Sequence, residues 1–75
     1  MLKAILDVKG LNCPLPIIRA RKAMQGLEIG AVLEIHTTDP ASIRDFGALC
    51  RSSGHEVIDQ SEEEGVYTFL IRKGT

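Results

Sequence analysis

The chain has 75 residues, with 9 Lys and Arg against 10 Asp and Glu, so its net charge is −1. This balance lacks the basic footprint of nucleic-acid binders, and two Phe, one Tyr and no Trp are too few for base-stacking platforms. No apolar run reaches the roughly 20 residues of a membrane-spanning helix, and the charged start has no signal-peptide pattern. We therefore expect a cytoplasmic protein that binds neither membranes nor nucleic acid directly.

The first half of the chain predicts a strand, a helix and a second strand. Residues 2–8, "LKAILDV", alternate so that Leu2, Ala4, Leu6 and Val8 share one face. Residues 14–26 have helical spacing, and residues 31–38 predict a strand after the Gly30 break. The core face of the helix comprises Ile17, Ala20, Ala23, Met24 and Leu27.

The second half predicts a helix and a hairpin. Asp39 is the expected N-cap and Pro40 the first helical residue of a helix that runs to about residue 52, before Gly54. Its expected buried stripe is Ile43, Phe46, Gly47 and Cys50. Residues 55–60 and 66–73 predict two strands, joined by the acidic turn "SEEEG".

The order of these elements predicts an α/β (α+β) fold of one domain, residues 1–75. A strand-helix-strand unit favours a parallel pair with a right-handed crossover. The economical arrangement is a two-layer sandwich, βαβαββ, in which a four-stranded mixed sheet carries two helices on one face. The other face of the sheet would be exposed, which explains why polar residues such as Lys3, Asp7, Glu34 and His36 alternate with apolar ones.

Cys13 is the main candidate for chemistry. It precedes a helix that starts with Pro14 and continues with Pro16, so we expect Cys13 at the N-cap, Pro14 at N1 and Pro16 at N3. The prolines would stiffen the turn that aims the sulfur. The positive end of the helix dipole would lower the pKa of the thiol and favour an anionic sulfur, whereas Asp39 at the same sheet edge would oppose this if it were more than a helix cap.

Other reactive arrangements are poorly supported. The chain has no CxxC pair and no general base at motif spacing from Cys13, and Cys50 fits a small buried hydrophobe better than a second reactive thiol. Two cysteines are no disulfide framework. His36 and His55 could join them around zinc, but no pair has finger-like spacing, so we predict no metal.

The outer face of the first helix is the candidate docking surface. Leu15 and Ile18 lie opposite the core stripe, and the candidate partner contacts are these two residues with Arg19, Arg21 and Lys22. The alternative is that the helix is rotated, or that the second helix covers the two aliphatic side chains. The basic residues could equally form an ordinary solvated face.

The stretch "LDVKGLNCPLPIIRARKAM" resembles the TusA/SirA family of small sulfur carriers, and the likeness continues through "TTDPASIRDF", "LCRSSGHEV" and "YTFLIRKG". The resemblance implies the fold derived above and a sulfurtransferase role. Cys13 would accept sulfur as a persulfide from a cysteine desulfurase or rhodanese and pass it to another protein's cysteine, without metal or organic cofactor.

The family's pathways include tRNA 2-thiouridine synthesis, molybdenum-cofactor assembly and oxidation of reduced sulfur compounds. Some members carry an acidic residue where this chain has Leu15, which implies a more apolar docking site here. A carrier must leave its donor, so we expect a monomer with transient partners. Two alternatives stay open: a non-catalytic interaction module and a redox-sensing thiol.

Overall fold

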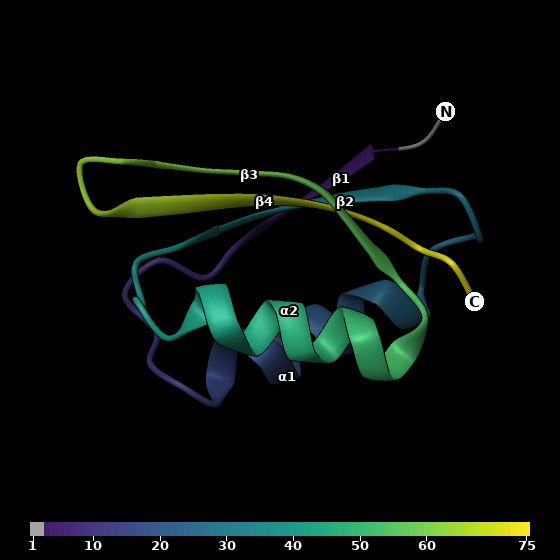
Figure 1. Cartoon of the computed structure of the whole chain (residues 1–75), viewed down its shortest axis with the longest axis horizontal. Coiled ribbons are helices and arrows are strands. Elements are labelled where there is room, and N and C mark those ends of the chain that lie inside the picture. The colour runs from purple at the N-terminus through teal and green to yellow at the C-terminus, as the bar shows by residue number, and fades with distance from the viewer. Residues whose placement is uncertain (1–2) are drawn as a thin grey trace.

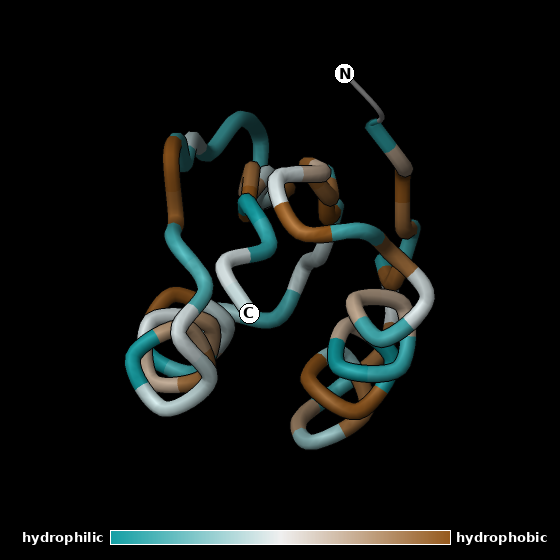
Figure 2. The backbone as a smooth tube through the Cα atoms, turned by 90° about the vertical axis from the view of Figure 1, so that its right-hand side faces the viewer, coloured by the Kyte–Doolittle hydropathy of each residue, from teal (hydrophilic) through white to brown (hydrophobic). Residues whose placement is uncertain are grey.

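The computed structural model describes residues 3–75. The elements are β1 (Lys3–Asp7), α1 (Leu15–Gln25), β2 (Val32–Thr37), α2 (Ser42–Ser53), β3 (Glu56–Glu63) and β4 (Val66–Arg72). They form one mixed sheet in the order β1-β2-β4-β3, in which β1 and β2 are parallel and the other pairs are antiparallel. Both helices cover one face of this sheet (Figure 1) and lie side by side beneath it (Figure 2). The predicted fold class is confirmed.

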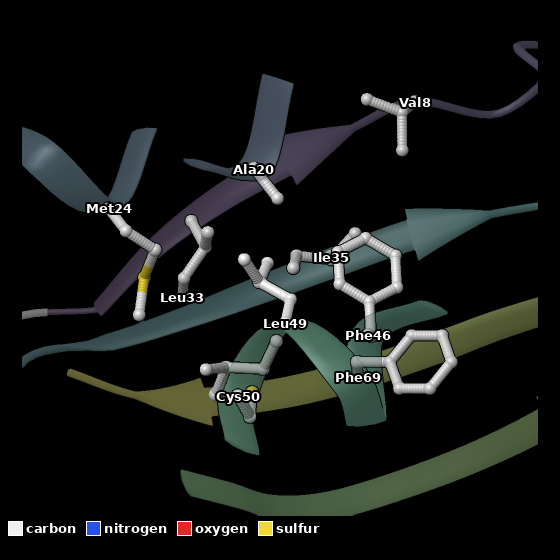
Figure 3. Close-up of a cluster of buried hydrophobic side chains, with 10 residues drawn as sticks. Val8, Ala20, Met24, Leu33, Ile35, Phe46, Leu49, Cys50 and Phe69 are labelled. Atoms are coloured by element: carbon white, nitrogen blue, oxygen red, sulfur yellow. The ribbon is translucent and has the colours of Figure 1, made fainter. Parts of the chain in front are cut away.

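The core lies between the sheet and the helices (Figure 3). The sheet contributes Leu33, Ile35, Phe69 and Ile71, and Val8 joins them directly after the end of β1. The helices contribute Ala20, Met24, Phe46, Leu49 and Cys50. The rings of Phe46 and Phe69 lie with their centroids 5.1 Å apart. The inward face predicted for the first strand is confirmed at Ala4, Leu6 and Val8, whereas Leu2 lies outside the described residues.

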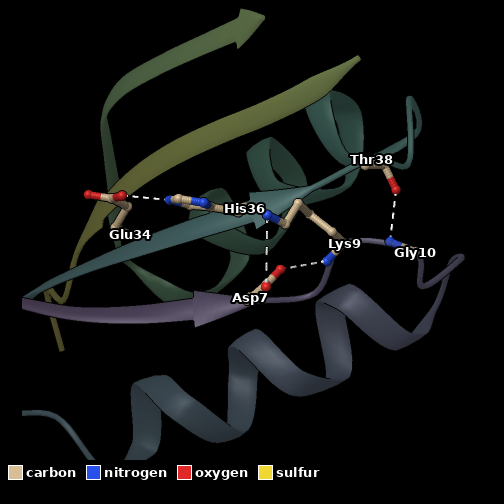
Figure 4. A network of polar contacts seen from close by, with 6 residues as sticks. All are labelled: Asp7, Lys9, Gly10, Glu34, His36 and Thr38. Carbon is tan, nitrogen blue, oxygen red and sulfur yellow. Dashed lines mark hydrogen bonds and ion pairs between the residues drawn. The ribbon is translucent and has the colours of Figure 1, made fainter. Parts of the chain in front are cut away.

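The outer face of the sheet carries the polar side chains that the alternation predicted, together with the exposed side chain of Ile5. Glu34 pairs with Lys3 at 2.7 Å and with His36 at 2.5 Å, and hydrogen bonds from Lys3 and then His36 hold the pKa of Glu34 below its usual value. Figure 4 shows Glu34 and His36 on β2, together with the neighbouring strand β1 and the loop that follows it. In that loop the Gly10 N–H donates to the Thr38 hydroxyl at 2.9 Å, which ties the ends of β1 and β2 together.

Two predicted details of the second half are wrong. Strand β3 continues through Glu63, because an exposed edge strand accommodates charged residues on both faces. Only Glu64 and Gly65 remain as the turn, both with positive φ, as a two-residue hairpin of type I′ requires. Ile43 was expected in the core but is 45% exposed, because α2 turns Ser42, Phe46, Leu49 and Cys50 inward instead.

The start of α2 also differs from the prediction. The helix begins at Ser42 with Ala41 as N-cap, two residues later than expected. Asp39 still stabilises this start, because its Oδ1 accepts the Ala41 N–H at 3.1 Å. The buried Ser42 hydroxyl is paired with the Thr37 hydroxyl at 3.1 Å, which explains why a polar residue is tolerated there.

No helix in residues 3–75 is long and apolar enough to cross a membrane.

Candidate functional site

Cys13 lies exposed in the loop between β1 and α1. Its place relative to the helix differs from the prediction: α1 begins at Leu15 with Pro14 as N-cap, so Cys13 is one residue outside the cap and Pro16 occupies N2. The Cys13–Pro14 peptide bond is cis. Pro16 is buried and anchors the first turn of the helix, whereas Pro14 is exposed beside the thiol.

The first turn of α1 offers few donors to an anion. Proline has no N–H, which removes the groups that residues 14 and 16 would supply. The Leu15 N–H donates to the Asn12 carbonyl at 2.9 Å. Among residues 14–17, only the Ile17 N–H is therefore left to bind an anion. The same prolines that shape this turn therefore weaken it as an anion site.

The backbone N–H of Cys13 is engaged as well. It donates to Asp39 Oδ2 at 2.8 Å, while the other oxygen of that carboxylate accepts the Ala41 N–H. Asp39 therefore links the cysteine loop to the start of α2. The two loops meet because β1 and β2 are parallel, so the helices that follow both begin at the same edge of the sheet (Figure 1). Asp39 is thus more than the helix cap that the sequence favoured.

The electrostatic surroundings of the thiol contradict the expected activation. The pKa of Cys13 is raised, chiefly by a hydrogen bond with the Asp45 carboxylate, then by partial desolvation and by the negative charges of Asp45 and Asp39. Arg44 acts in the opposite direction, and its effect is the smallest. The predicted fall in the pKa of this thiol is therefore wrong, because two carboxylates from the start of α2 outweigh a helix end that has lost most of its donors.

Cys13 lies at a groove between the two helices. One wall is formed by Cys13, Pro14, Ile17 and Arg21, and the other by residues of α2, namely Asp45, Ala48, Leu49 and Ser52. The lining is mostly apolar, with Arg21 and Asp45 as its charged members. A protein segment that reached the thiol would contact these residues from both helices.

The predicted docking residues fall into two groups. Arg21 faces the groove with Cys13, whereas Ile18, Arg19 and Lys22 line a separate hollow with Leu6 and Ala23, beside β1. Leu15 is 43% exposed and Ile18 is 54% exposed, so α2 does not cover them and the alternative of a rotated helix is wrong. All five candidates are accessible, but only Arg21 shares the groove with the thiol.

The sequence reasoning missed Arg44 and Asp45. A signal was available, because the start of any helix that follows β2 must lie beside the loop that follows β1, and Asp45 is in the first turn of that helix. The other cysteine behaves as predicted: Cys50 is 5% exposed, and burial raises the pKa of its thiol.

The histidines lie apart from Cys13. His36 is paired with Glu34 on the outer face of the sheet, and His55 Nδ1 accepts the Gly74 N–H at 3.1 Å. Within residues 3–75, no three His, Cys, Asp or Glu side chains gather in an arrangement that could hold a metal ion.

Comparison with known proteins identifies the family of this chain. Residues 4–73 match the family model described as sulfurtransferase TusA. The chain belongs to the TusA family. It is 47% identical to the sulfur carrier protein TusA of Allochromatium vinosum over 68 residues, which cover 91% of this chain and 90% of that protein. It is 43% identical to the sulfur carrier protein TusA of Pseudomonas putida, over 93% of this chain and 88% of that protein.

A solved structure agrees with this family assignment. The crystal structure of the SirA-like protein from Desulfitobacterium hafniense superposes with a TM-score of 0.84 at 28% identity, covering 96% of this chain and 99% of that chain. Membership of the TusA family supports a role in sulfur transfer, which involves protein partners that donate and accept sulfur.

Proposed function

We propose that this protein is a sulfurtransferase of the carrier type that binds sulfur covalently on Cys13. The observation that carries the proposal is the exposed Cys13 thiol, which stands at the inter-helix groove on a loop held by Pro16 and Asp39. An exposed thiol on a braced loop can reach a cysteine of a second protein, whereas Cys50 is enclosed in the core. The name carried by the relatives, sulfur carrier protein, supports the same role.

The transfer is an exchange between two sulfur centres. Cys13 attacks the terminal sulfur of a donor persulfide, R–S–SH, and forms a new S–S bond as the donor's S–S bond breaks. The donor leaves as a thiol, R–SH, after taking up the proton that Cys13 loses, and Cys13 carries the persulfide Cys–S–SH. Delivery is the same exchange in reverse order, with an acceptor cysteine as the attacking group. Neither step needs an external oxidant, metal or organic cofactor.

The partners are proteins with reactive cysteines. A cysteine desulfurase or a rhodanese fits the donor, and the acceptor belongs to tRNA thiolation or to another sulfur-trafficking pathway such as sulfur oxidation. Residues 1–75 would act as one carrier domain in the cytoplasm, as a monomer that meets each partner transiently. Leu15 is exposed at the start of α1, directly after the loop that carries Cys13, and Ile18 is exposed further along the same helix, which supports their role in docking.

A redox sensor fits the site less well. Sensor thiols react with oxidants as thiolates, so they usually have low pKa values and accessible sulfur. The pKa of Cys13 is raised instead, which leaves less thiolate for such a reaction.

Mass spectrometry of the intact protein tests the proposal. After incubation with a cysteine desulfurase and cysteine, the carrier should gain one sulfur atom, which a reductant removes. The exposed position of Cys13 allows Cys13→Ser to fold normally while losing this gain, and Cys50→Ala serves as the matched control that keeps it. Sulfur loading of Cys13→Ser would refute the assignment. A gain of oxygen would indicate a sensor instead, and no gain in the wild type would indicate a non-catalytic module.

A further inference from the structure

Asp45 is placed to control the thiol that the proposed function uses. It lies in the first turn of α2 and lines the same groove as Cys13, although its side chain is only 21% exposed. Its ion pair with Arg44 joins Nε and Oδ1 at 3.6 Å, and the Arg44 side chain is 82% exposed. An ion pair with so exposed a partner is weak, so the carboxylate keeps the capacity to interact with the sulfur.

The second carboxylate near the sulfur is already engaged by backbone N–H groups. The Asp39 carboxylate accepts the N–H groups of Cys13 and Ala41, one on each oxygen. From α1, Arg21 lines the groove. The backbone of α1 adds little support for an anion, since prolines occupy two positions of its first turn. Asp45 is therefore the group through which the charge on the sulfur can be changed without altering the fold of the loop.

We propose that Asp45 is a positioning residue that keeps the proton on Cys13 while the carrier is empty and unbound. The inference rests on the proposed sulfur-carrier function, in which Cys13 must lose this proton as it attacks the donor persulfide. A free carrier with a protonated thiol reacts slowly with unrelated electrophiles and oxidants. A donor that presents a cationic side chain to Asp45 would withdraw the carboxylate from the thiol, so that deprotonation becomes easier at the moment of contact.

The direction of the expected effect follows from charge. A carboxylate beside a thiol disfavours the thiolate and accepts a hydrogen bond from the protonated form. Asp45→Asn removes the charge with little change in size, so the thiolate should form at lower pH. Arg44→Gln removes a neighbouring cation whose charge favours the thiolate, so it should act in the opposite direction.

The rate of alkylation by iodoacetamide measures this effect on the full chain. Each protein is treated across a range of pH, and the modified Cys13 peptide is quantified by mass spectrometry, which separates it from Cys50. In Asp45→Asn the pH midpoint should fall while the rate at high pH stays unchanged, so the rate near neutral pH should rise about threefold or more. Asp45→Glu, which keeps the carboxylate, should remain close to the wild type, and Arg44→Gln should be alkylated more slowly near neutral pH.

The matched control is Asp59→Asn, which makes the same change on the exposed edge strand β3 and should leave the midpoint unmoved. An unchanged midpoint in Asp45→Asn, with circular dichroism showing a folded protein, would overturn the inference. So would an equal shift in Asp59→Asn. The outcome is separable from that of the proposed function, because sulfur loading that depends on Cys13 would still stand if the midpoint did not move.

Discussion

Asp39 offers a quantitative test of how the cysteine loop is held. Its carboxylate accepts the Cys13 N–H at 2.8 Å and the Ala41 N–H at 3.1 Å, so Asp39→Ala leaves two backbone donors without their partner. Hydrogen bonds to a charged group contribute about 1.5–3 kcal/mol each where they are shielded, and helix-cap losses reach about 2 kcal/mol. Asp39 is half-buried, so water can replace part of the loss, and we expect a total cost of about 2 kcal/mol.

That cost is large for a chain of 75 residues. For domains of this size, 1 kcal/mol shifts the melting temperature by about 4–8 °C, so Asp39→Ala should melt about 8–16 °C lower. Asp39→Asn should lose about half as much, because its carboxamide has one oxygen to accept one of the two N–H groups. Thermal denaturation followed by circular dichroism measures both variants.

Hydrogen exchange adds a local readout for the same variants. The Cys13 amide should exchange faster in Asp39→Ala than in the wild type, while amides in the core strand β2 should change only as far as global stability changes. Asp59→Ala, on the exposed edge strand, is the control and should melt close to the wild type. If Asp39→Ala melted within about 2 °C of the wild type with unaltered Cys13 exchange, the assigned role of the carboxylate would be refuted.

Two further substitutions separate docking from folding. Leu15→Asp should change the free energy of unfolding by less than about 0.5 kcal/mol, because Leu15 is 43% exposed. The same variant should slow sulfur loading from a cysteine desulfurase by about tenfold, which is equivalent to about 1.4 kcal/mol. A Leu15→Asp variant that unfolded would show instead that Leu15 belongs to the core. Phe46→Ala should lower the free energy of unfolding in urea by about 3–5 kcal/mol, since the Phe46 ring is fully buried against Phe69. The control Ile29→Ala changes a side chain that is 72% exposed and should lower it far less. A similar loss for the last two would contradict the described core.

The sequence alone determined the order of the elements, the layers and the exposed cysteine. Those features depend on local patterns: alternation in residues 3–8, helical spacing between Ile17 and Met24, and proline at the start of α1. Such patterns show which face of each helix or strand is buried, and a window of a few consecutive residues is enough to read them. The length of β3 escaped the prediction, because an edge strand exposed on both faces lacks the apolar alternation that identifies a strand.

The charge environment of Cys13 was decided only by the tertiary structure. Asp39 is 26 residues away along the chain, yet its carboxylate oxygen lies 2.8 Å from the Cys13 nitrogen, because parallel pairing of β1 and β2 brings both following loops to one sheet edge. Electrostatic interactions depend on distance in space and on the local dielectric, not on separation in sequence. The helix end suggested an activated thiol, whereas the fold supplied two carboxylates that keep the pKa of Cys13 high.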